Sequence, residues 1–370
     1  MKKITFVFLV GLLAVSCGQT TKKQAETMVK NQENPLAQAN TIKPVSEDSL
    51  FKQIYDQEEQ FDSILKPQNI NLYDLLNLEY NIKRKVGFIS LSDNYPLSEH
   101  PDSLAIPDLS KIKDREYFKL NSKYRERFLA KTKTSETDTV FIYDYSANVL
   151  LSFPVKDLNV TAYSDVYNDP DECNPLSDRY RGYPCNQDDY MIGFEISKNH
   201  LKGLSEDFDD ALVYVGKENP FVQGQMEPIV WKKINSKDFP LAKASFQTAN
   251  IPKGDTYLYE SSEFQYFLQN LLRINRTEVW ARHLLVIDKK SKKATVERIL
   301  GSGEGTEVLP LNFGIENKED ADYKGQWTGK LFKNKPPVVL GFESVSFGCP
   351  RITVLDPKEG DIYLNCDNRN

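Results

Sequence analysis

Short apolar runs, separated by proline, asparagine, aspartate and glycine, fill most of the chain after Lys85. Residues 86–91, 140–143 and 149–153 are examples of such runs. Runs of about four to eight residues bounded by turn-forming residues are typical of β-strands. The sequence therefore predicts an α+β, β-rich fold, in which antiparallel sheets are built from hairpins and a few helices pack on them.

Three segments share one pattern: a strand-like run, an aspartate that enters a polar turn, and a second run. The aspartates are Asp144, Asp288 and Asp356. Aspartate suits this position because its carboxylate accepts hydrogen bonds from the backbone N–H groups just ahead. The pattern predicts three hairpins. The blades of a propeller are the alternative, but the aspartates are not spaced at the regular period of about 40–50 residues that a propeller requires.

A helical pattern interrupts the strands at residues 262–272. Ser262 and Gln265 have the spacing of a capping box, in which two side chains satisfy backbone N–H groups of the first turn. The apolar residues recur at helical spacing, which predicts a helix with one stripe facing the core. The stripe consists of Phe264, Phe267, Leu268, Leu271 and Leu272.

Two further helices are expected. Residues 50–65 carry apolar side chains at helical spacing, between a cap at Ser46 or Asp48 and a stop at Pro67. Residues 123–131 form a basic stretch, which we interpret as a helix with one solvated face.

The N-terminus has a basic head followed by the apolar run of residues 4–15. This run is shorter than the roughly 20 residues that cross a bilayer core, which favours a signal peptide over a membrane anchor. Residues 13–17, Leu-Ala-Val-Ser-Cys, resemble the lipobox of bacterial lipoproteins. The resemblance implies removal of residues 1–16 and acylation of Cys17. An ordinary secretory signal is the alternative.

The composition of the whole chain suggests four parts. Residues 1–16 are the signal peptide, and residues 17–45 form a lipidated flexible tether, because they contain almost no large apolar side chain. Residues 46–210 are expected to form an α+β region and residues 211–370 a β-rich region. The body after the tether, about 320 residues, is longer than one typical core of about 100–200 residues. Two compact units or a single large domain over both regions therefore both stay open.

The chain has a formal net charge of −6 and a pI of about 5.4. Binding to nucleic acid phosphates needs a clustered positive surface. The acidic balance therefore argues against nucleic acid as a partner.

Export would place the cysteines in an oxidising compartment, where the four besides Cys17 form an even set with three possible pairings. Cys349 and Cys366 flank residues 356–360, whose chemistry predicts a hairpin turn that brings the two together. By the same reasoning from short separation, we predict a second disulfide. It joins Cys173 and Cys185.

The acidic loop of residues 168–178 contains clustered carboxylates. They suit calcium, because this hard cation binds six to eight oxygens. Asp169, Asp171 and Asp178 are the candidate ligands. The EF-hand pattern is absent, because Asn174 stands where that pattern requires glycine. A solvated acidic loop is the alternative, and no cofactor is expected.

The histidines give no support for zinc. His100, His200 and His283 do not form an HxxxH or HExxH pair. In a strand, His283 would share one face with apolar neighbours, which favours a core histidine. Residues 301–305 are glycine-rich but lack the spacing of a nucleophile elbow or a phosphate-binding loop, so we expect a turn.

One glutamate is a candidate for acid chemistry on glycans. Glu343 lies among aromatic residues in a strand-like run. Glycoside hydrolysis needs a second carboxylate that only the fold can bring close. Tryptophans could stack on sugars, although tryptophans in strands mostly serve packing. They are Trp231, Trp280 and Trp327.

Four Asp-Ser/Thr-apolar triplets resemble the O-glycosylation sequon that Bacteroidota use on exported proteins. The resemblance implies glycan attachment at the hydroxyl of the central residue, while helix caps and turns are the alternative role of such pairs. The central residues are Ser49, Ser63, Ser103 and Thr139.

The sequence favours a cell-envelope lipoprotein that acts as a non-enzymatic binding or assembly module. Its expected partners are the membrane, through the lipid anchor, and an envelope protein or glycan. The alternative is a periplasmic or surface hydrolase that acts on glycans through paired carboxylates. Residues 18–23 lack the acidic run that resembles surface-export signals, which favours the outer membrane with the protein facing the periplasm.

Overall fold

Strands dominate the computed structural model, as the sequence predicts. It describes residues 65–66, 68–80, 84–92, 105–164, 171–172, 177–182, 187–246, 251–273, 277–303, 305–313, 324–346 and 348–366, together with Lys52, Asp56 and Thr248. These residues all belong to one unit, Val45–Asn370. The expected helix at residues 50–65 lies almost wholly outside the described residues.

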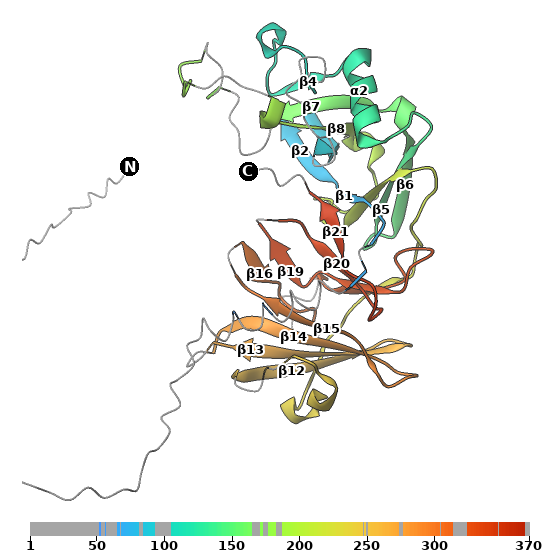
Figure 1. Cartoon of the computed structure of the whole chain (residues 1–370), viewed down its shortest axis with the longest axis vertical. Helices are drawn as coiled ribbons and strands as arrows, with labels where there is room; N and C mark the ends of the chain where they lie inside the picture. Colours follow the sequence, from blue (N-terminus) through green and yellow to red (C-terminus); the bar gives the residue numbers. More distant parts are fainter. Residues whose placement is uncertain are drawn as a thin grey trace, which may run out of the picture. The chain divides into compact units, whose positions relative to one another are not determined.

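A curled sheet of nine strands runs through the unit (Figure 1). Its pairs are antiparallel except β1 with β21, which run parallel with Leu72 beside Leu364. β9 follows residue 210 and pairs with both β1 and β5, so this sheet takes strands from both expected regions. In spatial order it contains β10 (Met226–Pro228), β17 (Trp327–Gly329), β18 (Val338–Leu340), β20 (Arg351–Val354), β21 (Ile362–Asn365), β1 (Leu72–Asp74), β9 (Ala211–Gly216), β5 (Thr139–Asp144) and β6 (Val149–Pro154).

Two five-stranded antiparallel sheets and one two-stranded pair complete the β structure. The first contains β11 (Lys232–Ile234), β12 (Lys253–Glu260), β13 (Phe264–Leu272), β14 (Val279–Asp288) and β15 (Ala294–Gly301). The second contains β2 (Leu76–Tyr80), β3 (Arg84–Ser90), β8 (Tyr190–Ser197), β7 (Asn159–Ser164) and β4 (Tyr117–Lys119). The pair is β16 (Thr306–Val308) with β19 (Glu343–Val345). Sheets of these sizes do not repeat the four-stranded blade of a propeller, so for the described residues that alternative is wrong.

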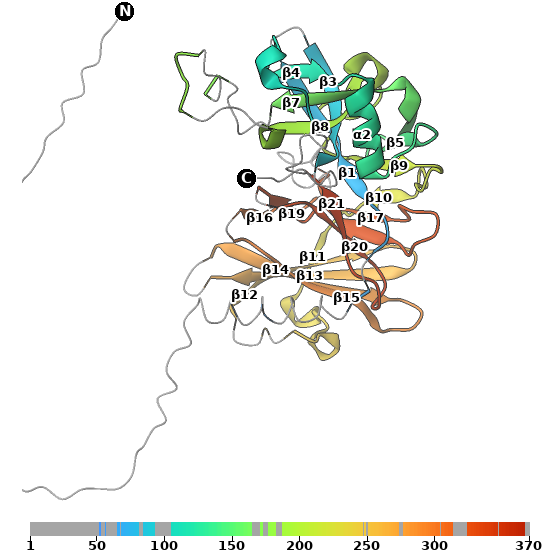
Figure 2. The ribbon, with the colours of Figure 1, turned by 45° about the horizontal axis from the view of Figure 1, so that its top comes forward.

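One α-helix of the described residues, α2 (Ser122–Thr132), confirms the helix expected over residues 123–131. The Asn121 side chain caps it by accepting hydrogen bonds from Lys123 and Tyr124 N–H. Phe128 is fully buried and packs edge-on against Phe194 of β8, so the apolar face of α2 covers the second five-stranded sheet (Figure 2). Short 3₁₀ turns occur at Leu109–Lys111, Val155–Asp157, Gln187–Asp189, Lys198–His200, Ser236–Asp238 and Leu241–Lys243.

The three predicted hairpins are confirmed. β5 pairs with β6, β14 with β15, and β20 with β21, all antiparallel. In each turn the aspartate accepts a backbone N–H from two or three residues ahead, as expected for this position. The donors are Ala147 to Asp144, Ser291 to Asp288 and Lys358 to Asp356.

The predicted helix at residues 262–272 is wrong, because this segment is the strand β13. Both faces of β13 are buried: Leu268 packs in one cluster and Leu271 in another. Apolar residues on both faces of a strand mimic helical spacing, and the pairing with β12 and β14 decides between the two. Ser261, rather than Ser262, accepts the N–H of Phe264, and Gln265 donates to Glu260.

Candidate functional site

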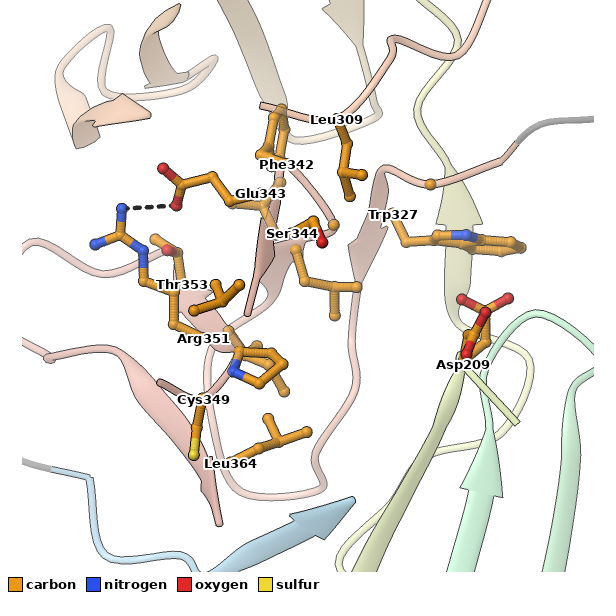
Figure 3. Close-up of a pocket in the computed structure, with 18 of the residues that line it drawn as sticks. Asp209, Leu309, Trp327, Phe342, Glu343, Ser344, Cys349, Arg351, Thr353 and Leu364 are labelled. Carbon is orange, nitrogen blue, oxygen red and sulfur yellow. Dashed lines mark hydrogen bonds and ion pairs between the residues drawn. The ribbon is translucent and has the colours of Figure 1, made fainter. Parts of the chain in front are cut away.

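A cleft of about 1520 Å³ is the candidate site (Figure 3). Its lining residues stand at strand ends: Asp74 ends β1, Tyr145 follows β5, Trp327 opens β17, Glu343 opens β19 and Arg351 opens β20. Buried apolar side chains of β14, β15 and β18 complete the lining. The hairpins and the curled sheet therefore bring together residues that are far apart in the sequence.

Carboxyl groups gather at one end of the cleft. Asp74, Asp209 and Asp210 line this end with the phenol of Tyr145. The Tyr145 hydroxyl hydrogen-bonds with the Asp210 carboxyl, and the backbone N–H of Tyr145 donates to the Asp210 carbonyl at 3.2 Å. Figure 3 shows Asp209 beside Trp327, whose ring contacts Tyr145 edge-on with centroids 5.6 Å apart. We call Asp74, Asp209, Asp210 and Tyr145 the acidic end.

Burial raises the pKa values of Asp74, Asp210 and Tyr145. Desolvation raises the pKa of Asp74, the N–H of Leu75 lowers it in part, and the charge of Asp209 raises it again. Desolvation also raises the pKa of Asp210, against the hydrogen bonds from Ser146 and Tyr145 that lower it. The pKa of Tyr145 lies well above its ordinary value, first through desolvation and then through Asp210. A carboxyl with a raised pKa can take up and release a proton closer to neutral pH.

Asp144 lies beside the acidic end but has a structural role. It is fully buried, and its carboxylate accepts hydrogen bonds from Ser146 Oγ and Ala147 N–H at 3.0 and 2.8 Å. Its other oxygen accepts the N–H of Ser205 at 2.7 Å. These bonds fix the β5–β6 turn against the loop before β9, which holds Asp209 and Asp210.

Glu343, the carboxylate that the sequence singled out, lies across the cleft from Asp209 (Figure 3). Its Oε1 accepts the N–H of Gly301 at 3.0 Å, and its Oε2 accepts from the guanidinium of Arg351 at 3.0 Å. Arg351 also lies 3.8 Å from Asp361, which is paired with the buried Arg298. Both oxygens of Glu343 are engaged in joining β19, β15 and β20, so its position favours a structural role.

The three tryptophans are buried, at 5% exposure or less. Trp327 lines the cleft, and its indole N–H donates to the Lys324 carbonyl at 2.6 Å, so it forms a fixed wall. The open aromatic surface at the cleft belongs instead to Tyr363 of β21, which is 57% exposed. Its position opposite Arg351 in the β20–β21 ladder places it at the rim.

His283 is a core histidine, as the strand pattern predicted. It is fully buried, and its Nε2 lies 2.7 Å from Glu297 Oε1. His200 ends an exposed turn, and His100 lies outside the described residues. In the described ranges, no group of three His, Cys, Asp or Glu side chains could hold a metal ion.

The calcium candidates are only partly visible. The Asp171 carboxylate pairs with the guanidinium of Arg179, and Asp178 is exposed. Asp169 lies outside the described residues. The calcium site therefore stays a prediction.

One of the two predicted disulfides is present. Cys349 and Cys366 are bonded at 1.98 Å with their Cα atoms 5.5 Å apart, and Cys349 lines the cleft. Cys173 and Cys185 lie outside the described residues, so their pairing stays a prediction.

The modification candidates are mostly outside the described residues. These are Cys17, Ser49, Ser63 and Ser103. Thr139 is described: it opens β5, is half-buried, and pairs with Pro154 and Gly216. The preceding Asp138 accepts the N–H of Ser135 at 2.7 Å, a turn role of the kind expected for such pairs.

The glycine-rich residues near 301 form the expected turn, since the Gly303 N–H donates to the Thr306 carbonyl at 2.8 Å between β15 and β16. Of the helices among the described residues, none is long and apolar enough to cross a membrane. Comparisons with protein-family models, curated proteins and solved structures found no match.

Sequence reasoning missed the acidic end. Its members come from two distant segments, Asp74 at the end of β1 and Asp209–Asp210 before β9. The pairing of β1 with β9, Asp74 opposite Leu212, is what brings them close. A local Asp-Asp pair is too common on surfaces to signal a site by itself.

Proposed function

We propose that this chain is a lipid-anchored protein of the bacterial cell envelope whose cleft binds a glycan. The anchor is supported by residues 1–17, with their basic head, apolar run and lipobox-like ending. The described surface of this tethered body carries few large exposed apolar side chains. Recognition through an exposed apolar patch is therefore not favoured, and another surface is needed. The cleft is that surface.

The observation that carries the proposal is the combination of size and lining of the cleft. Its volume of about 1520 Å³ exceeds the roughly 300–1,000 Å³ of a typical small-molecule site, which suits an extended ligand. The carboxyls and phenol of the acidic end can donate and accept hydrogen bonds, as sugar hydroxyls require. Tyr363 offers an exposed ring at the rim, on which the apolar face of a sugar can stack.

Binding is testable by titrating purified protein with envelope oligosaccharides in a calorimeter. Tyr363→Ala should weaken binding by about tenfold, the order expected for one lost aromatic contact. The matched control is Tyr180→Ala, which removes another exposed tyrosine outside the cleft and should leave affinity unchanged. Equal affinities of the wild type and Tyr363→Ala for every glycan that binds would refute the cleft as the site.

A second function, glycan hydrolysis, is favoured by the raised pKa values of Asp74 and Asp210, which burial causes, beside the exposed Asp209. A protonated Asp210 would give its proton to the glycosidic oxygen, while a neighbouring carboxylate takes a proton from the attacking water. Asp209 is that neighbour. The carboxylates now proposed are those of the acidic end rather than Glu343.

The two functions are separated by analysing the same glycan mixtures for shorter products. Turnover by the wild type that is lost in Asp210→Asn, with binding retained, would establish the hydrolase. Binding without any product would leave the protein as a binding module.

A further inference from the structure

The turn between β14 and β15 carries four lysines in five residues: Lys289, Lys290, Lys292 and Lys293. A fifth joins them from the segment before β12, because Lys243 Nζ donates to the Lys292 carbonyl at 2.9 Å. Lys243, Lys290, Lys292 and Lys293 are all exposed. We call these four residues the lysine tip.

Acidic groups balance only part of this charge. Glu260 lies 3.5 Å from Lys289, and its pKa is lowered first by the hydrogen bond from Gln265 and then by the charges of Lys289 and Lys232. The Asp288 carboxylate is engaged within the turn by Ser291. Glu263 is the third acid at this end, and its carbonyl accepts the N–H of Lys289. Five lysines therefore stand beside three carboxylates at this turn, on a chain whose formal net charge is −6.

The residue type indicates the kind of partner. The lysine tip contains no arginine. Lysine ammonium groups are flexible point charges, whereas arginine makes fixed, bidentate contacts to a single phosphate. Clusters of four to eight basic residues with this character attract anionic lipid surfaces. We propose that the lysine tip docks on the anionic phospholipid headgroups of the membrane.

A membrane is favoured over other polyanions because it would lie within reach. A flexible segment the length of residues 17–45 spans about 30 Å on average, so an anchored body meets the bilayer surface continually. A weak electrostatic contact is then enough to orient the body. This step depends on the proposed anchoring for the nearness of the membrane, while the charge of the tip does not.

The test uses residues 18–370, which lack the signal and Cys17, so that no lipid contributes. Cosedimentation is measured with phosphatidylglycerol-containing vesicles and with phosphatidylcholine vesicles. The triple change Lys290→Gln, Lys292→Gln and Lys293→Gln should weaken binding to the anionic vesicles by about 100-fold, about fivefold for each lysine. Added salt should weaken wild-type binding, because exposed charges are screened.

Two matched variants make the result specific. The same three lysines changed to arginine keep the charge and should keep binding. Lys123→Gln, Lys131→Gln and Lys133→Gln remove equal charge from exposed positions at α2 and should leave binding within about twofold of the wild type.

The proposal is overturned if the tip variant binds as the wild type does, or if the α2 variant weakens binding equally. It is also overturned if a single-stranded oligonucleotide binds through the tip and the anionic vesicles do not. Glycan titrations of the tip variant separate this test from the cleft: unchanged glycan affinity with lost vesicle binding assigns each function to its own surface.

Discussion

Two regions of the molecule bury carboxyl groups, and the pKa values of these groups shift in opposite directions. In the sheet of β11 to β15, Glu297 is 6% exposed and accepts hydrogen bonds from Ser245 N–H at 2.6 Å and Phe246 N–H at 3.0 Å. His283 completes the set at 2.7 Å. Burial alone raises the pKa of Glu297, but these three partners lower it below its ordinary value.

The acidic end of the cleft has fewer donors. Asp74 accepts one N–H, from Leu75 at 3.1 Å, and Asp210 is met by the hydroxyls of Ser146 and Tyr145. Desolvation therefore prevails, and the pKa values of Asp74 and Asp210 are raised. The difference teaches that the number of donors decides whether a buried carboxyl is part of the structure or keeps hydrogen-bonding capacity for a ligand.

The largest effect is expected from Glu297→Ala. The change leaves two backbone N–H groups and a buried histidine without their acceptor, so unfolding free energy should fall by about 3–5 kcal/mol. Urea unfolding at neutral pH measures it. Because the folded pKa of Glu297 is lowered, its contribution is present above its ordinary value of 4.5 and is lost as pH falls through the folded pKa, so the difference from wild type should shrink in acid.

Glu307→Ala is the matched control, since Glu307 is an exposed glutamate on β16 and its loss should change stability by less than about 0.5 kcal/mol. If Glu297→Ala cost no more than Glu307→Ala, the contrast between the two regions would not hold.

A smaller loss, about 3 kcal/mol, is expected when the Cys349–Cys366 disulfide is removed by Cys349→Ser with Cys366→Ser. The bond closes 17 residues of sequence, and the loop-entropy relation gives that order. Unlike Glu297, it borders the cleft, so glycan binding should weaken as well. Thermal unfolding of the oxidised and reduced wild type provides the comparison. A stability change without any effect on binding would show that this wall does not shape the site.

The hairpins could be predicted from sequence because their determinants are local. Asp144, Asp288 and Asp356 each satisfy a backbone N–H within three residues, so the signal and the interaction share one segment. The Cys349–Cys366 disulfide was predictable for the same reason, since the turn between them sets their distance.

The strand β13 and the acidic end could not be predicted, because long-range pairing determines both. Phe267 and Leu268 have helical spacing with Leu271, and only the ladders with β12 and β14 show that they face opposite sides of a sheet. The sequence favoured Glu343 as an acid because of its aromatic neighbours. It could not reveal that the Glu343 carboxylate accepts the N–H of Gly301, 42 residues away. Asp74 became part of the site through β9, which the sequence places far from it.

The smallest effect, a gain, is expected from Asp74→Asn. A carboxyl with a raised folded pKa contributes fully below its ordinary value of 3.8 and loses that contribution as pH rises through the folded pKa. The charged form is thus a cost at neutral pH, and asparagine removes it while its amide oxygen still accepts the N–H of Leu75. We expect the unfolding free energy to rise by about 1 kcal/mol at pH 7 and to equal that of the wild type below pH 3.8, measured by urea titration across pH. Asp361→Asn, at a carboxylate paired with the buried Arg298, should have the opposite sign. Destabilisation by both changes would remove the distinction between carboxyls with many donors and carboxyls with few.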